Sequence, residues 1–228
     1  MGIPDQLTIH KILAAPRHSL IYLASDKDTS YVVKTPRQKS DAILEAYEDE
    51  YHTLSSLSHP VLPVYYGLIP ELIIGQAKDP VPALLMEYID GTALSSAHYL
   101  TTKQLKKYIL DLGDVLLLLL SNGLLYTDLH PGNLLIAKDQ LRLIDFTCAY
   151  YFIRNPHPSY VPKISYHLNQ NLKGQQLLIQ ALTFLLSHLS DDLTSGIPPS
   201  LLSLGENPYK GLDFSDFLNQ LSIKWRTD

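Results

Sequence analysis

The feature that most constrains the fold is a change of hydrophobic period near Asp90. Before it, short apolar pieces such as "LTIHKIL", "SLIYLAS" and "SYVVKTP" lie between turn residues, which is typical of short antiparallel strands. Residues 40–57 interrupt this pattern with apolar side chains at helical spacing behind Ser40, the expected N-cap. "HPVLPVYYGLI" and "PALLMEYID" return to strand character. Residues 1–90 therefore predict a β-rich unit with one helix.

After Asp90 the pattern becomes helical. "TTKQLKKYILDLGDVLLLLLSNG" has apolar residues every three or four positions and ends on Asn122-Gly123, a common C-terminal cap. "NLLIA" and "LRLIDF" flank "KDQ" and predict a hairpin, and "KGQQLLIQALTFLLSHLS" predicts a second helix. We therefore expect an α+β chain in which residues 91–228 are mainly helical.

Composition narrows the function classes. With 46% hydrophobic residues in 228, the chain can bury a sizeable core, which argues against disorder. A net charge of -5 and the lack of a basic stripe argue against a nucleic-acid partner. The strongest apolar run, "VLLLLLSNGLLY", is interrupted far short of the roughly 20 residues of a membrane helix. The single cysteine, Cys148, excludes an internal disulfide framework, so we expect a cytoplasmic protein.

Five polar residues stand at positions that suit one chemistry. Lys34 ends a predicted strand, Glu50 lies on the predicted helix, Asp128 and Asn133 lie in the loop "YTDLHPGNLL", and Asp145 follows a short apolar run. Each alone has an ordinary explanation as a solvated charge or a turn residue. Together they meet the needs of phosphoryl transfer from ATP: a cation for the phosphates, carboxylate and amide oxygens for metal ions, and a carboxylate for the attacking hydroxyl.

In this order and spacing the chain resembles the protein kinase superfamily from about Leu7 to about Phe146. "YVVKTP" is similar to the strand with the phosphate-binding lysine, "EYHTLSSLSHPVLPVYYG" to the helix with its glutamate partner, and "LLMEYIDG" to the hinge. "YTDLHPGNLL" is similar to the catalytic loop and "LRLIDF" to the metal-binding segment. The resemblance implies a bilobal kinase-like fold, with an ATP-binding N-lobe (residues 1–90), a shortened catalytic C-lobe (residues 91–228), and ATP in the cleft between them.

The resemblance also implies a role for each matching position. Lys34 would contact the α- and β-phosphates of ATP and pair with Glu50, and Asp128 would orient the substrate hydroxyl or accept its proton. Asn133 and Asp145 would hold Mg²⁺. Three positions would border the adenine, namely the side chain of Met86 and the backbones of Glu87 and Ile89.

The chain departs from the family pattern at several positions. Ala14, Pro16 and Ser19 occupy the three glycine positions of the phosphate-covering loop, so the grip on the nucleotide is expected to be looser or differently shaped. Thr127 replaces the arginine before the catalytic aspartate, which removes the cation that would meet a phosphorylated activation loop. His130 replaces a lysine; it could donate a hydrogen bond to the transferred phosphoryl group or simply bind loop backbone.

The second half departs further. No "APE"-like motif is present, Gln175 stands about where the family has a buried aspartate, and "RNPHPSYVPKISYH" is expected to replace the activation and substrate-docking region. The lone Trp225 is expected to be a packing anchor for the tail.

Three functions are consistent with these observations. The leading one is an ATP- and Mg²⁺-dependent protein serine/threonine kinase of a small, atypical bacterial type, acting on an unidentified protein. A small-molecule kinase of the aminoglycoside or choline phosphotransferase class, acting on a small-molecule hydroxyl, is the alternative suggested by "DLHPGN". A nucleotide-binding pseudokinase scaffold is the third, suggested by the missing glycines. Nothing in the sequence indicates the oligomeric state.

Overall fold

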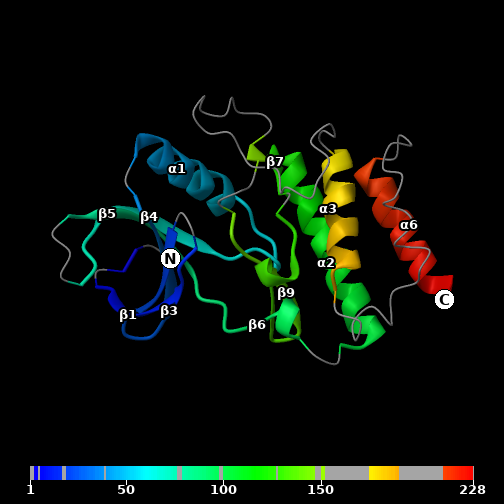
Figure 1. Cartoon of the computed structure of the whole chain (residues 1–228), viewed down its shortest axis with the longest axis horizontal. Coiled ribbons are helices and arrows are strands. Elements are labelled where there is room, and N and C mark those ends of the chain that lie inside the picture. The colour runs from blue at the N-terminus through cyan, green and yellow to red at the C-terminus, as the bar shows by residue number, and fades with distance from the viewer. Residues whose placement is uncertain are drawn as a thin grey trace. The chain divides into compact units, whose positions relative to one another are not determined.

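The structure is a computed structural model that divides into two compact units, Met1–Asp90 and Gly91–Asp228 (Figure 1). It describes residues 3–4, 6–16, 19–38, 40–75, 79–97, 100–126, 128–146, 150–151, 175–189 and 213–227. Thr127, Thr147, Cys148 and the segment "RNPHPSYVPKISYH" lie outside the described residues.

The N-terminal unit contains one five-stranded antiparallel sheet with the strand order β1-β2-β3-β5-β4. The strands are β1 (Thr8–Ala14), β2 (Ser19–Ser25), β3 (Ser30–Pro36), β4 (Tyr65–Leu72) and β5 (Val81–Glu87). One face of the sheet carries a buried cluster of Ala24, Tyr31, Val33, Ala83 and Leu85. The predicted strands are confirmed, although β4 begins only at Tyr65 because residues 57–64 form turns and irregular chain.

Helix α1 (Asp41–Ser55) connects β3 to β4. The Ser40 side chain accepts a hydrogen bond from the backbone N–H of Ile43, so the predicted N-cap is confirmed. Tyr47, Glu50 and Leu54 are all buried and lie on one stripe, since they are separated by three and four positions. An apolar stripe was predicted here, and the structure adds a carboxylate to it.

The C-terminal unit is organised by helix α2 (Thr102–Ser121), whose predicted length and C-terminal end are confirmed. Thr101 and Gln104 form a capping box at its start, and Gly123, with φ of 79°, follows the C-cap Asn122. Its buried residues recur at helical spacing and include Leu105, Ile109, Leu112, Leu116 and Leu119. Within the described part of the chain, no helix is long and apolar enough to cross a membrane.

The predicted hairpin is confirmed as β8 (Leu134–Ala137) and β9 (Gln140–Leu143). β6 (Thr92–Ala93) extends it into a three-stranded sheet, with the 3-10 turns η1 (Leu94–Ser96) and η2 (Pro131–Asn133) nearby, and β7 (Leu124–Leu125) pairs with β10 (Tyr150–Tyr151). The two-residue strands were not predicted, because two residues carry no period.

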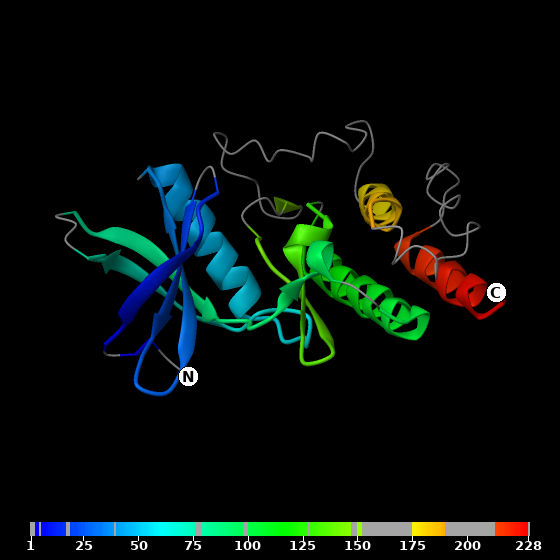
Figure 2. The same ribbon diagram turned by 60° about the horizontal axis from the view of Figure 1, so that its bottom comes forward.

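Two further helices complete the described part of this unit. Helix α3 (Gln175–Ser187) confirms the second predicted helix, and α6 (Phe214–Thr227) packs against both α2 and α3 (Figure 2). Helix α6 was not predicted, since breaker residues precede its short apolar pattern. Trp225 is 6% exposed on α6, which confirms its expected role as a packing anchor.

The contact between α2 and α6 depends on Gly113. A Cβ atom at Gly113 would lie 2.5 Å from Cδ2 and 2.8 Å from Cδ1 of Leu218. We expect Gly113→Val to lower the free energy of unfolding by about 1–3 kcal/mol because of overpacking. Chemical denaturation measures this, and Asp114→Val, at an exposed position of the same helix, should change it by less than about 0.5 kcal/mol. Equal losses from both variants would contradict this close packing.

The β8–β9 turn places two non-glycine residues in left-handed conformations, Lys138 with φ of 49° and Asp139 with φ of 59°. Such a pair is typical of a type I′ turn, which favours Asn-Gly. We therefore expect Lys138→Asn combined with Asp139→Gly to raise the melting temperature, through about 1 kcal/mol of added stability. No gain in a thermal unfolding experiment would contradict the assigned turn conformation.

Candidate active site

Lys34 and Glu50 form a buried ion pair in the N-terminal unit. Each is 2% exposed, and Lys34 Nζ lies 2.9 Å from Oε1 and 2.8 Å from Oε2 of Glu50. The Lys34 ammonium also lies 5.6 Å from the centre of the Tyr47 ring, within cation–π distance. The predicted pairing of these two residues is therefore present in the structure.

Strand alternation explains how a lysine reaches the helix. Tyr31 and Val33 of β3 belong to the buried cluster on one face of the sheet, and neighbouring residues of a strand point to opposite faces. Lys34 therefore points to the other face, where it meets Glu50 of α1. The helix itself packs on β4 and β5.

The expected adenine-binding positions follow one another at the end of β5. Met86 is 9% exposed, pairs across the sheet with Val32 and Tyr65, and lies on the side of the sheet that carries Lys34. The backbone N–H of Glu87 donates to Val64 O at 2.8 Å, and the Glu87 carboxylate accepts from the Val64 N–H at 3.1 Å. These two bonds fasten the beginning of the predicted hinge to the segment before β4.

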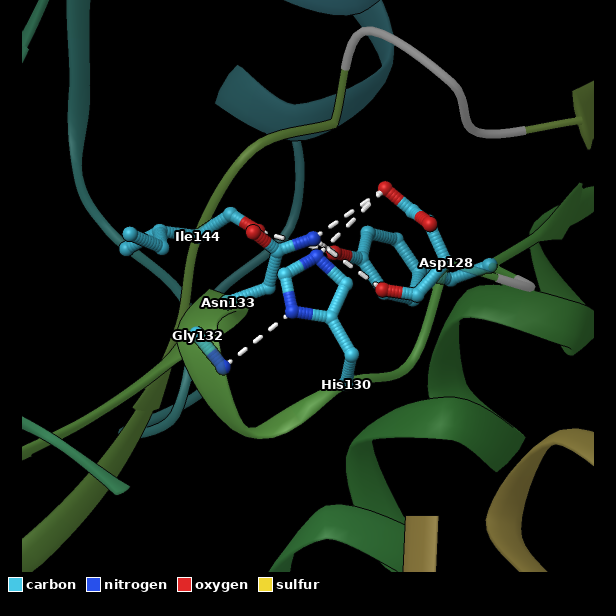
Figure 3. Close-up of polar contacts among 6 residues, drawn as sticks. Asp128, His130, Gly132, Asn133 and Ile144 are labelled. Carbon is cyan, nitrogen blue, oxygen red and sulfur yellow. Dashed lines mark hydrogen bonds and ion pairs between the residues drawn. The ribbon is translucent and has the colours of Figure 1, made fainter. Parts of the chain in front are cut away.

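The loop "YTDLHPGNLL" is organised around the amide of Asn133, which is 7% exposed (Figure 3). Its Nδ2 donates to the Asp128 backbone oxygen at 3.1 Å, to Asp128 Oδ2 at 3.2 Å and to the Tyr126 hydroxyl at 3.2 Å. The structure therefore brings together Asp128 and Asn133, as expected from their spacing.

Two hydrogen bonds connect this loop to the chain just before Asp145. The Ile144 N–H donates to Asn133 O at 2.9 Å, and the Tyr126 hydroxyl donates to Ile144 O at 2.9 Å. The Tyr126 ring also packs edge-on against Phe146, with ring centres 5.1 Å apart. Asp145 itself is exposed and has φ of 61°, an uncommon conformation for a non-glycine residue that costs of order 1–3 kcal/mol. The hydrogen bonds of Ile144 and the packing of Phe146 hold Asp145 in this conformation.

The side chain of His130 contacts the loop backbone and lies near Asp128. Its Nδ1 accepts a hydrogen bond from the Gly132 N–H at 3.1 Å, so the neutral ring carries its proton on Nε2. Nε2 lies 3.9 Å from Asp128 Oδ2, and the imidazole is 44% exposed. A Cβ atom at Gly132 would lie 3.0 Å from the ring, so glycine leaves the space that this ring position requires.

The β1–β2 loop, where the family has glycines, is held by a side chain instead. Arg37 Nε donates to Pro16 O at 2.8 Å, and its Nη2 donates to Ala15 O at 2.9 Å. Ala14 ends β1 and the buried Ser19 begins β2. These contacts of Arg37 were not predicted from the sequence.

Gln175, at the position of the family's aspartate, has a structural contact. Its Oε1 accepts a hydrogen bond of 2.6 Å from the backbone N–H of Phe214, the first residue of α6. The side chain therefore helps to cap the helix that the sequence analysis missed.

Asn133 and Asp145 have the ligand chemistry that Mg²⁺ prefers. Asn133 Oδ1 accepts no hydrogen bond from any residue that the structure describes, and Asp145 is an exposed residue. In the same described ranges, no three His, Cys, Asp or Glu side chains are grouped closely enough to hold a metal by themselves. Mg²⁺ usually combines one or two carboxylates with substrate phosphates and water.

Three residues of the site were missed from the sequence: Tyr65, Tyr126 and Arg37. The Tyr65 hydroxyl donates to Glu50 Oε1 at 2.8 Å, and Tyr126 joins Asn133 to Ile144 as described above. Tyrosine is frequent in this chain, with 15 residues, so residue type alone carried no signal. The position of Tyr126, two residues before Asp128, was the sequence signal that could have indicated its contact with the loop.

Comparisons with known proteins indicate the family of this chain. The signature of the protein kinase domain matches residues 17–180. The serine/threonine-protein kinase PknG of Mycolicibacterium smegmatis is 32% identical over 149 residues, which cover 63% of this chain and 19% of that protein. PknG of Mycobacterium leprae is 30% identical over 135 residues, which cover 55% and 17%. PknB of Mycobacterium tuberculosis is 24% identical over 160 residues, which cover 64% and 25%.

The chain thus spans roughly a fifth of the length of its PknG relatives. The kinase-domain match, in contrast, covers well over half of this chain, and it includes every candidate site residue described above. With the antiparallel sheet and helix α1 of its N-terminal unit and the helices of its C-terminal unit, this α+β chain belongs to the protein kinase family.

Proposed function

We propose that this protein transfers the γ-phosphate of ATP to serine or threonine hydroxyls of a protein, with Mg²⁺ as the metal. The observation that carries the proposal is the hydrogen-bond network that fastens Asp128, Asn133 and the Ile144–Asp145 segment to one another. A carboxylate for the hydroxyl and two oxygen ligands for the metal are the groups that phosphoryl transfer requires. The network holds Asp128 and Asn133 close to the Ile144–Asp145 segment.

Lys34 is assigned to the α- and β-phosphates of ATP and Glu50 to the orientation of Lys34. Burying an ion pair is weak evidence for stability, because desolvation of the two charges offsets much of their attraction. Two apolar side chains of similar volume would stabilise the core of this unit as well as the ion pair does. The pair at 2.8–2.9 Å is therefore better explained by the need for a fixed cation than by folding.

The hinge residues and the metal ligands follow from the same assignment. Met86 borders the adenine, and the backbones of Glu87 and Ile89 meet its edge. Since the Glu87 N–H already donates to Val64 O, its contact to adenine is assigned to its carbonyl oxygen. Asn133 and Asp145 would hold Mg²⁺, which would neutralise charge on the phosphates.

Asp128 and His130 are assigned to the acceptor hydroxyl and the transferred group. The hydroxyl oxygen forms a bond to the γ-phosphorus, the bond to the β,γ-bridging oxygen breaks, and the hydroxyl proton passes to Asp128. His130 Nε2–H, on the same side as Asp128 Oδ2, donates a hydrogen bond to the transferred phosphoryl group. His130 thus takes the role of the lysine that the family has at this position.

The proposal includes a cytoplasmic location and a protein partner. A single cysteine in 228 residues is consistent with a reducing compartment, and ATP is abundant there. The serine/threonine-protein kinases among the relatives support a protein rather than a small molecule as acceptor.

Label transfer from γ-labelled ATP tests the reaction. With Mg²⁺ and a generic protein acceptor, we expect label on serine or threonine of the protein, and Asp145→Ala and Asp128→Asn should each reduce the rate by about 10²–10⁴-fold. Asp114→Asn, an exposed aspartate of α2, is the matched control and should retain the wild-type rate.

Other outcomes would replace the proposal. ATP turnover without labelled protein would indicate a small hydroxyl compound as acceptor. No turnover together with no Mg²⁺-dependent ATP binding would indicate a scaffold. Full activity of Asp128→Asn would contradict the role of that carboxylate.

The dependence of activity on Mg²⁺ concentration tests Asn133. Asn133→Ala removes Oδ1, so we expect the Mg²⁺ concentration at half-maximal rate to rise by about 10–100-fold. Asn122→Ala, at the C-cap of α2, removes an amide outside the site and should leave that concentration unchanged. A lower maximal rate with the same Mg²⁺ dependence would contradict the assignment of Asn133 as a metal ligand.

A further inference from the structure

Tyr65 stands at the start of β4 and reaches the Lys34–Glu50 pair from a third element. Its hydroxyl donates to Glu50 Oε1 at 2.8 Å, and its side chain is part of the buried interior, since Tyr65 is 8% exposed. Glu50 Oε1 thus accepts from both Lys34 and Tyr65, and Oε2 accepts from Lys34. The carboxylate is held by groups from β3 and β4 while its own backbone belongs to α1.

The third partner matters because the other two side chains are flexible. Lysine carries a point charge on a four-carbon stem, and glutamate has three rotatable bonds, so an ion pair alone defines their positions poorly. Tyrosine is rigid and has only two side-chain torsions. Tyr65 is fixed further by its sheet pairing with Met86. A hydrogen bond to a charged acceptor is also among the stronger ones.

The orientation of the Glu50 carboxylate in turn determines where the Lys34 ammonium lies. Both oxygens of Glu50 contact Nζ, so rotation of the carboxylate would move or release the ammonium. All three residues belong to the N-terminal unit, which therefore forms this contact by itself. Loss of the Tyr65 hydroxyl would leave the buried carboxylate with one lone-pair site less satisfied.

We propose that Tyr65 is a positioning residue for ATP, whose hydroxyl holds Glu50 so that Lys34 is presented to the phosphates. This inference rests on the proposed function, since it concerns the affinity that Lys34 supplies. The Tyr65 hydroxyl therefore affects the binding of the phosphates and not the binding of adenosine.

The chain offers a matched control in Tyr31. Its hydroxyl donates to Asp26 Oδ2 at 2.7 Å, and Tyr31 is 4% exposed in the same sheet. Tyr31→Phe therefore removes the same kind of hydrogen bond, from a buried tyrosine to a carboxylate, at a different place. Comparable losses of thermal stability in Tyr65→Phe and Tyr31→Phe would show that the two changes are equivalent for folding.

The experiment measures dissociation constants of ATP with Mg²⁺ and of adenosine for the full chain. For Tyr65→Phe we expect about tenfold weaker ATP binding and unchanged adenosine binding, because a hydrogen bond to a charged group is lost behind the phosphate-binding lysine. Tyr31→Phe should bind both ligands like the wild type. Wild-type ATP affinity in Tyr65→Phe, or an equal loss for ATP and adenosine, would overturn the inference.

Lys34→Arg separates failure of the inference from failure of the proposed function. It keeps a positive charge for Glu50 but replaces the ammonium with a planar guanidinium. If Lys34→Arg weakens ATP binding and Tyr65→Phe does not, the inference about Tyr65 is wrong and the assignment of Lys34 stands. If neither variant changes ATP binding, the assignment of Lys34 to the phosphates is wrong, and the inference falls with it.

Discussion

The buried ion pair between Lys34 and Glu50 sets the most exacting geometric requirement in the N-terminal unit. Removing two charges from water costs several kcal/mol per ion, which is recovered only with close contacts and satisfied lone pairs. The register of β3 and the rotation of α1 must both be correct to place Nζ 2.8 Å from Glu50 Oε2. A slip of β3 by one residue would turn Lys34 into the apolar cluster around Val33.

The loop from Tyr126 to Asn133, in contrast to the ion pair, is held mainly by contacts between residues that are close in the sequence. Within the loop, the buried amide of Asn133 donates hydrogen bonds to the backbone and the side chain of Asp128. The backbone N–H and C=O of Ile144 connect the loop to the next segment, through Asn133 O and the Tyr126 hydroxyl. The left-handed conformation of Asp145 is supported on both sides, by these contacts and by the buried Phe146. Strain at this position is consistent with a functional demand on it.

Much of this could be predicted from the sequence because it depends on local periodicity and on the spacing of a few polar residues. The strands of the N-terminal sheet, α1 with its Ser40 cap, α2 and the β8–β9 hairpin were all predicted. Helix α6 was not, because its burial comes from packing on α2 and α3 rather than from a strong period of its own. The contacts of Arg37 with the β1–β2 loop were not predicted either, because Arg37 lies outside the motif.

Most of the longer elements, their order and the family could be predicted from the sequence, because hydrophobic period and motif spacing are properties of consecutive residues. The hydroxyls and cations that support the site could not, because their contacts form only in the folded chain. Tyr65 meets Glu50 and Tyr126 meets Ile144 across 15 and 18 positions of the chain. Such contacts depend on strand register and helix rotation, so residue type carries almost no information about them.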